Sequence, residues 1–259
     1  MWGLLINIAL MSYVYGHYQD FIPLYVYYAL KTNPDISIKI FLKEELTDYN
    51  RKMLDRFATD NVQVVENYFI PCPIDKLGGI RALIPEEEFS EFDYIYLTDI
   101  DMVEIQDMTE RCHYDLMRCE ILGLPFNSGF YKTHFKVGVL SRIYMGCMFI
   151  KVKPYYEKMS NIIDNIFDDD HKEYIDKIKS LGSDELLLYY MLDQVFKLDL
   201  SLFEDHVPHG ANLHVITYGG LSWEPSSSFE KSLIDDICKN GFEETRKIFH
   251  WNSVLKLKM

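Results

Sequence analysis

Two kinds of apolar segment alternate through the first hundred residues, and this alternation constrains the fold more than any other feature of the chain. Short runs rich in β-branched and aromatic residues predict strands at residues 4–11, 37–42, 62–66 and 94–97. Between them, residues 21–31 and 44–57 carry apolar side chains at helical spacing. Strands that alternate with helices form a mostly parallel sheet covered on both faces. The sequence therefore predicts an α/β fold with a mostly parallel central sheet.

The second half of the chain is less regular. Residues 106–146 are polar and aromatic with interspersed Gly and Pro, which predicts a loop-rich insertion. Further strands are expected at 147–152 and 200–203, and helices at 154–167, 184–197, 229–239 and 242–256. We expect a main domain over residues 1–215 and a small C-terminal helical extension over residues 216–259 packed on it.

Composition excludes several classes of protein. The chain has 259 residues, of which 48% are hydrophobic, so it can bury a large core. A formal net charge of -14 argues against binding a nucleic-acid backbone, which requires clustered Lys and Arg. Five scattered cysteines without a Cys-x-x-Cys spacing favour a reducing compartment, and we expect a cytoplasmic location. No apolar stretch reaches the roughly 18 residues that a membrane-spanning helix needs.

Two carboxylates, Asp99 and Asp101, end the strand around residues 94–97. Residues two apart on an extended chain point the same way, so both carboxylates can converge on one hard cation while Ile100 faces the apolar side. Taken alone, an Asp-x-Asp is most often a solvated turn. A strand this apolar has no evident reason to end in two like charges unless a cation offsets them. We therefore interpret the pair as a candidate metal site.

Three other features are candidates, and each also has a simple structural explanation. Asp184 and Glu185 open a helix, where acidic side chains also favour the helix dipole. His209 follows a predicted strand and could complete a site with two carboxylates, although a surface histidine is the default. Arg81 follows Gly78 and Gly79 and offers a bidentate fork to phosphate, although an exposed ion pair explains it equally well.

The order of these segments resembles the retaining type-A fold glycosyltransferases related to glycogenin and bacterial lipopolysaccharide galactosyltransferases. The resemblance covers roughly residues 1–215 as collinear order rather than close identity. The segments that carry it are Ser12-Tyr13-Val14-Tyr15, Arg81-Ala82-Leu83-Ile84-Pro85, Thr98-Asp99-Ile100-Asp101, Met145 to Val152, Ser183-Asp184-Glu185 and His209 to His214. The resemblance implies a type-A glycosyltransferase fold with a nucleotide-sugar-binding catalytic domain over residues 1–215.

The same resemblance implies roles for particular residues. Asp99, Asp101 and His209 would hold Mn²⁺ or Mg²⁺ across the diphosphate of a nucleoside diphosphate-sugar, with a UDP-sugar as the expected donor. Arg81 would add a cation near the phosphates, and Tyr13 would stack on or bond to the nucleobase. Asp184 would accept hydrogen bonds from sugar hydroxyls. Glu185 would support the oxocarbenium-like centre.

The chain departs from that family in two places. The usual His-x-x-Gly-x-x-Lys-Pro-Trp ending is absent, so His209 is our choice of third metal ligand, with His214 and His250 as alternatives. Glu185 stands where many relatives carry Gln, which could alter how the reactive face of the sugar is supported.

The expected activity is metal-dependent transfer of a sugar to an acceptor hydroxyl on a glycan or lipid-linked glycan, with retention, in polysaccharide biosynthesis. A nucleotidyltransferase acting on sugar phosphates and a non-catalytic carbohydrate-binding module are the alternatives. The acceptor would be chosen by residues 106–141. Lys256 and Lys258 would add only about 2 kcal/mol of attraction to an anionic membrane surface, so a solvated tail is expected and peripheral membrane contact is the alternative.

Overall fold

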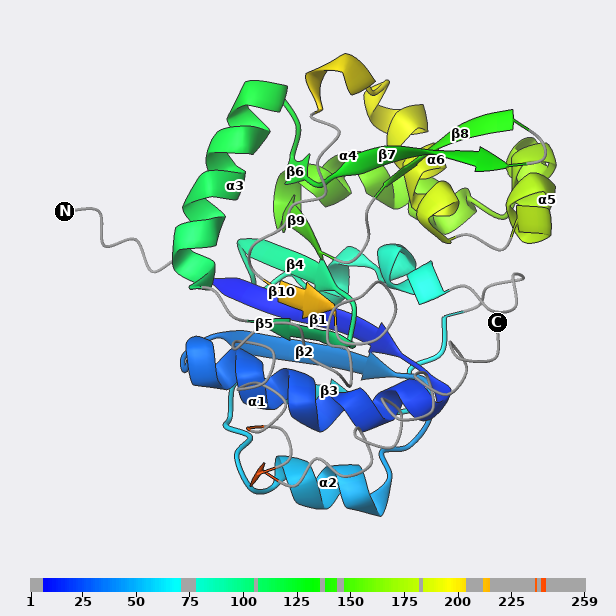
Figure 1. Ribbon diagram of the computed structural model, residues 1–259. Coiled ribbons are helices and arrows are strands. Elements are labelled where there is room, and N and C mark those ends of the chain that lie inside the picture. Colours follow the sequence, from blue (N-terminus) through cyan, green and yellow to red (C-terminus); the bar gives the residue numbers. More distant parts are fainter. Residues whose placement is uncertain are drawn as a thin grey trace.

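A computed structural model of the chain describes residues 7–70, 78–104, 107–135, 138–143, 147–181, 184–203, 212–214, 236 and 239–240. Six strands form its central sheet in the order β3-β2-β1-β4-β9-β6 (Figure 1). Their bounds are Val62–Val65 (β3), Ser37–Leu42 (β2), Ile8–Val14 (β1), Tyr94–Thr98 (β4), Cys147–Lys151 (β9) and Phe126–Asn127 (β6). The first four strands are mutually parallel, and β9 runs antiparallel to both β4 and β6. The predicted, mostly parallel sheet is confirmed.

Helices cover both faces of this sheet (Figure 1). One face is packed by α1 (Ile22–Thr32), α2 (Asp48–Leu54) and α3 (Met108–Leu122). The other is packed by α4 (Val152–Asn165), α5 (Lys172–Leu181) and α6 (Asp184–Phe196), together with the 3-10 helix η2 (Gly78–Leu83). The 3-10 helix η3 (Glu86–Glu88) has no buried residue and contacts α4. The remaining 3-10 helices are η1 (Gly16–Phe21), η4 (Asp169–His171) and η5 (Leu200–Leu202).

Side-chain alternation along the strands divides the core into two halves. In β1, Ala9, Met11 and Tyr13 pack toward α4 and α6, whereas Ile8, Leu10 and Val14 pack toward α1 and α2. All seven residues of this strand are buried. A strand buried on both faces reads as a continuous apolar run, which is why the parallel strands were recognisable in the sequence.

Two small sheets flank the central one. β5 (Met102–Glu104) pairs antiparallel with β10 (Asn212–His214), and β7 (Phe130–Phe135) pairs antiparallel with β8 (Gly138–Ile143). β5 follows β4 after only three residues. The β5–β10 pairing therefore brings a late part of the chain back beside the Asp-x-Asp segment.

The prediction that residues 106–146 form a loop-rich insertion is wrong. They contain the 15-residue helix α3, the short strand β6 and the β7–β8 hairpin. Asp107 caps α3 by accepting from the backbone N–H of Thr109 at 2.7 Å, and Gly123 ends it in the left-handed conformation. The buried side of α3 includes Arg111 and Asp115, so its hydrophobic period is weak in the sequence.

A second prediction also fails, because the expected strand at 200–203 is the 3-10 helix η5. Asp199 precedes this turn, and its side chain accepts from the backbone N–H of Ser201 at 3.0 Å and from the Ser201 hydroxyl at 2.6 Å. A local side-chain cap of this kind competes with extended structure.

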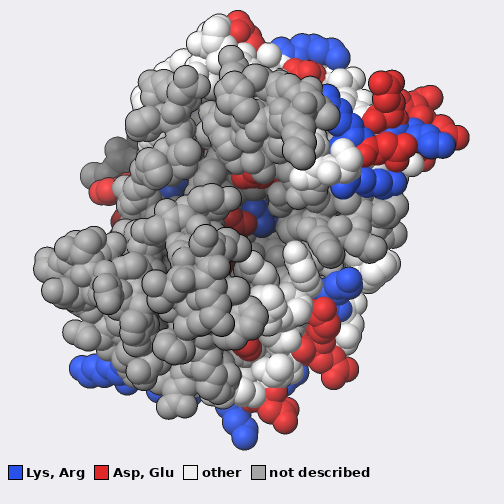
Figure 2. Space-filling model, turned by 45° about the vertical axis from the view of Figure 1, so that its right-hand side comes forward, with Lys and Arg blue, Asp and Glu red and all other residues white. Residues whose placement is uncertain are grey.

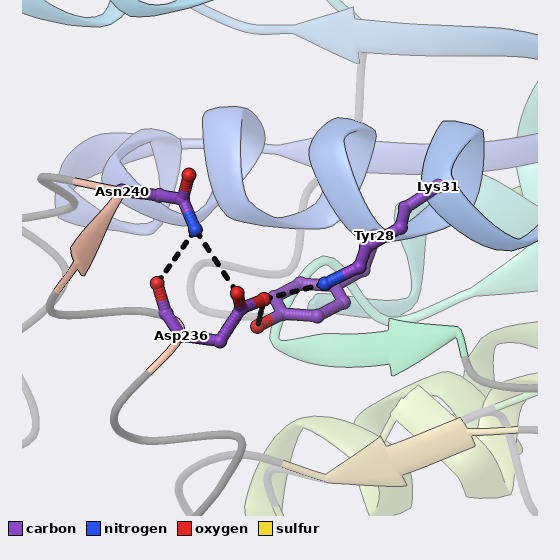
Figure 3. A network of polar contacts seen from close by, with 4 residues as sticks. All are labelled: Tyr28, Lys31, Asp236 and Asn240. Atoms are coloured by element: carbon purple, nitrogen blue, oxygen red, sulfur yellow. Dashed lines mark hydrogen bonds and ion pairs between the residues drawn. The ribbon is translucent and has the colours of Figure 1, made fainter.

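The C-terminal extension is described only at residues 236, 239 and 240. Figure 3 shows its contact with α1: the Asp236 carboxylate accepts from the Tyr28 hydroxyl at 2.8 Å and from Lys31 Nζ at 2.7 Å. Asn240 donates to the backbone oxygen of Asp236 at 2.7 Å. The division into residues 1–215 and 216–259 stays a prediction.

Candidate active site

Asp99 and Asp101 lie in the turn between β4 and β5, outside the carboxyl end of β4. The side chain of Asp99 is 27% exposed, whereas Asp101 is buried. Ile100 between them packs into the core on the α1 face, as the alternation predicted. In open α/β sheets, ligands bind outside the carboxyl ends of the strands, so the acids lie at the edge where a site is expected.

Arg81 forms an ion pair with Asp99, with 2.5 Å between a guanidinium nitrogen and Asp99 Oδ1. The Arg81 side chain is only 4% exposed. η2, which carries Arg81, contacts both β1 and α6. A buried guanidinium thus lies next to the carboxylate, and the alternative of an exposed arginine is excluded.

Tyr18 is within electrostatic range of both acids, although the sequence did not single it out. Its phenol pKa is raised by burial first, and then by the nearby charges of Asp101, Tyr15 and Asp99. The Tyr18 ring centroid lies 6.2 Å from that of Tyr15 and 4.9 Å from that of His17. These residues follow the carboxyl end of β1, the strand beside β4. Their position after a strand adjacent to the Asp-x-Asp strand could have identified them in the sequence as candidate site residues.

Tyr13 has a different environment from Tyr18. It belongs to β1, is 4% exposed and donates its hydroxyl to the backbone oxygen of Tyr68 at 3.3 Å. The structure therefore places Tyr13 in the core on the α4 face, one residue before β1 ends. Its assigned contact with a nucleobase stays a prediction.

The last residue of β4 is held from two directions. The Thr98 hydroxyl lies 2.5 Å from the Tyr25 hydroxyl of α1 and donates to the backbone oxygen of Met11 at 3.3 Å. All three residues are buried. Because Asp99 follows directly, this contact fixes the point at which the acidic turn leaves the sheet.

Asp184 and Glu185 are the first two residues of α6, as predicted. Glu185 is partly exposed. α6 packs on η2 and on the hairpin strand β8, so one helix contacts both the segment that carries Arg81 and the hairpin. The helix that carries Asp184 and Glu185 therefore packs on the segment that carries Arg81, and the roles of the two acids stay predictions.

The third predicted metal ligand cannot be placed in the same way. His209 and His250 fall outside the described residues, and His214 is described only as a backbone position, opposite Met102 in the β5–β10 pair. In the part of the chain that the structure describes, no three His, Cys, Asp or Glu side chains form a group that could hold a metal ion. Asp99 and Asp101 are two carboxylates that lie together in one turn at this edge.

The arrows of β1 and β2 point to the right in Figure 1, and Figure 2 turns that side forward. This face is hollowed, and acidic and basic side chains lie side by side in the hollow (Figure 2). The carboxyl ends of β1 and β2 point toward this face, and ligands of open α/β sheets bind outside the carboxyl ends of the strands.

Comparison with known proteins supports the fold assignment. No family model and no curated sequence matches the chain. Among solved structures, an active-site variant of LgtC superposes with a TM-score of 0.50 at 12% identity, covering 88% of this chain and 94% of LgtC. The apo form of the glycosyltransferase GlyE from Streptococcus pneumoniae gives a TM-score of 0.50 at 12% identity, covering 96% of this chain and 63% of GlyE. This chain therefore spans less than two thirds of GlyE.

The molecule has a mixed α/β fold of a class that includes glycosyltransferases. More specifically, it has the type-A glycosyltransferase fold, and the resemblance to the LgtC and glycogenin group is confirmed at the level of the fold. Among the described helices, none has both the length and the hydropathy required to cross a bilayer.

Proposed function

We propose that the protein is a glycosyltransferase that moves a sugar from a nucleoside diphosphate-sugar, with a UDP-sugar as the expected donor, to an acceptor hydroxyl. The observation that carries this proposal is the position of Asp99 and Asp101 in a type-A glycosyltransferase fold. They follow β4 directly, Asp99 is paired with the buried Arg81, and the charges of both acids help to raise the pKa of Tyr18.

The donor atoms at this edge fit a hard divalent cation. Carboxylate oxygens are the ligands that Mg²⁺ and Mn²⁺ prefer, and two of them lie in one short turn. We propose that Asp99 and Asp101 bind the cation with His209, and that His214 and His250 are the alternatives. A bound cation would offset the negative charge of the diphosphate.

The other residues would position the donor. Tyr18, which is within electrostatic range of the acids, is proposed to line the nucleotide site together with Tyr13. Arg81 would hold Asp99 in place through their ion pair and add positive charge near the phosphates. A guanidinium suits this role because it stays protonated even when it is buried.

Asp184 and Glu185 are proposed to contact the sugar, Asp184 through hydroxyl hydrogen bonds and Glu185 near the anomeric carbon. In the transfer, the acceptor oxygen bonds to the anomeric carbon and the bond to the diphosphate oxygen breaks. The hydroxyl proton passes to the departing diphosphate or to solvent. One matched structure is an active-site Gln-to-Glu variant of LgtC, the same type of exchange that distinguishes Glu185 from relatives with Gln there. We propose retention of configuration at the anomeric carbon.

A screen of nucleotide sugars tests the donor and the reaction class together. Each sugar is incubated with the protein and Mn²⁺, and released nucleoside diphosphate is measured. Release from at least one sugar supports the proposal. A protein that instead releases pyrophosphate from a nucleoside triphosphate and a sugar phosphate is a nucleotidyltransferase. One that binds carbohydrate but shows no manganese-dependent affinity for nucleotides is a binding module.

Asp99→Asn tests the site itself, with Asp93→Asn as the matched control. Asp93 is an exposed acid directly before β4, at the opposite end of the strand from Asp99. Asp99→Asn should lose metal-dependent hydrolysis of the donor, whereas Asp93→Asn should keep it. Near-normal hydrolysis by folded Asp99→Asn, with donor and metal supplied, would refute the assignment.

A further inference from the structure

One long segment of this acidic chain contains no acid. Residues 121–156 include Lys132, Lys136, Arg142, Lys151 and Lys153, while all 40 Asp and Glu residues lie elsewhere. In a chain whose net charge is -14, such a segment forms a local basic region. Its function depends on where the fold places each basic position.

The sheet register places the start and end of the β7–β8 hairpin at the edge of the sheet where Asp99 and Asp101 lie. β6 and β4 both run antiparallel to β9, so β6 ends at the same edge of the sheet as β4. β9 then begins at Cys147, which lies opposite Thr98, the residue directly before Asp99. The hairpin, residues 130–143, is inserted between these two points. Lys151 lies at the opposite end of β9, paired with Tyr94, and Lys153 lies in the first turn of α4, so neither is part of this group.

Two basic positions occupy neighbouring rungs of the hairpin. Lys132 lies opposite Ser141, and Arg142 lies opposite Tyr131. Both rungs are nearer to the Phe130–Ile143 rung than to the Phe135–Gly138 rung. Adjacent rungs of a two-stranded ribbon belong to opposite faces. Whichever face packs on α6, one of the two basic positions therefore belongs to the other face.

The hairpin also contacts the helix that carries two of the proposed site residues. β8 packs on α6, whose first residues are Asp184 and Glu185. Asp99 and Asp101 make this edge acidic, and an anionic acceptor that approaches it would be repelled unless basic side chains lie nearby. Lys132 and Arg142 are cations that the hairpin brings to the same edge.

We propose that the β7–β8 hairpin binds the acceptor and that this acceptor carries a phosphate group. The inference rests on the proposed glycosyltransferase function and names the chemical class of its second substrate. Lys and Arg are the side chains that recognise phosphate, Arg through a fork and Lys as a point charge. The phosphate belongs either to a soluble glycosyl phosphate or to a lipid-linked glycan, and both present the same group to the hairpin.

The first test compares acceptors that differ only in charge. Each hexoside is supplied in three forms: neutral, phosphorylated, and phosphorylated and attached to a lipid in vesicles. The donor is the nucleotide sugar found in the hydrolysis screen. The readout is the ratio of kcat/KM for the phosphorylated and neutral members. We expect this ratio to fall at least about tenfold in Lys132→Glu or Arg142→Glu. Lys179→Glu, on the surface of α5, should leave the ratio unchanged.

A second measurement does not depend on catalysis. Hexose 6-phosphate is titrated into metal-free protein, and the backbone amide signals of the hairpin are followed by NMR. We expect shifts that saturate, weaken with added salt and disappear in Lys132→Glu or Arg142→Glu. Unchanged hairpin signals, or equal use of neutral and phosphorylated acceptors by the unmodified protein, would overturn the inference.

The two proposals fail in distinguishable ways. If no nucleotide sugar is hydrolysed, the glycosyltransferase assignment fails, while the metal-free titration still reports whether the hairpin binds phosphate. If donors are hydrolysed but the charge reversals change neither the acceptor ratio nor the titration, only the acceptor inference is refuted.

Discussion

The Arg81–Asp99 ion pair should make both residues necessary for stability, and unequally so. Arg81 is 4% exposed and the Asp99 side chain is 27% exposed. Removing one partner of a buried ion pair typically costs about 3 to 5 kcal/mol, because the other charge loses its compensation. Asp99→Asn leaves the more buried charge behind, so we expect a loss of about 3 kcal/mol. Arg81→Met leaves a carboxylate that water can reach, so its loss should be smaller.

A double-mutant cycle measures this coupling. The free energy of unfolding is obtained from urea titrations of the unmodified protein, both single variants and the double variant, in buffer with a chelator so that bound metal does not contribute. Side chains in contact usually show interaction energies above about 0.5 kcal/mol. The double variant should therefore lose less stability than the sum of the single losses.

Two results would refute this reasoning. Additive losses, within about 0.5 kcal/mol, would mean that the two side chains do not interact in solution. A larger loss in Arg81→Met than in Asp99→Asn would mean that the burial difference does not set the cost. Asp93→Asn serves as control, since Asp93 is exposed and a surface change of this kind usually alters stability by less than about 0.5 kcal/mol.

Three further predictions concern other parts of the molecule. Burial raises the pKa of Asp236, but hydrogen bonds from Lys31 and Tyr28 outweigh this effect and lower the pKa overall. The Asp236 carboxylate should therefore stabilise the folded protein at pH values above its pKa in the unfolded chain. This stabilisation should be lost as the pH falls through its pKa in the folded protein. Because Lys31 is half exposed, Asp236→Asn should cost only about 1 kcal/mol, measured by urea titration at pH 7 and at pH 3, where the difference should shrink. Asp115 is buried and accepts from Tyr96 at 2.7 Å and from Asn127 at 2.6 Å, so Asp115→Ala should lower the free energy of unfolding by about 3 kcal/mol or more, and a loss below about 1 kcal/mol would contradict this. Burial first, and then the charge of Asp115, raise the pKa values of the Cys112 and Cys119 thiols to about 12, so both should resist a thiol reagent at pH 8 until the protein unfolds; rapid labelling of the folded protein would disprove it.

Much of the parallel half of the fold was readable from the sequence. β2 is found at its predicted residues, 37–42, and α1 differs from the expected helix at 21–31 by one residue at each end. These elements are buried on predictable faces, so their apolar periods are strong. α3 was missed because Arg111 and Asp115 pair with each other inside the core, and that pairing is invisible to a hydrophobic pattern. The N-cap Asp107 and the C-cap Gly123 were its remaining signals.

Sequence alone determined the alternation of strands and helices, the Asp99 and Asp101 pair at the end of an apolar strand, and Asp184 and Glu185 at the start of a helix. Each of these is a local feature that depends on residues close together in the sequence. Only the tertiary structure decided that Arg81 pairs with Asp99, that Tyr18 is within electrostatic range of the acids, and that β10 pairs with β5. Each of these interactions joins separate segments of the chain, and strand order and register, rather than residue spacing, bring them together.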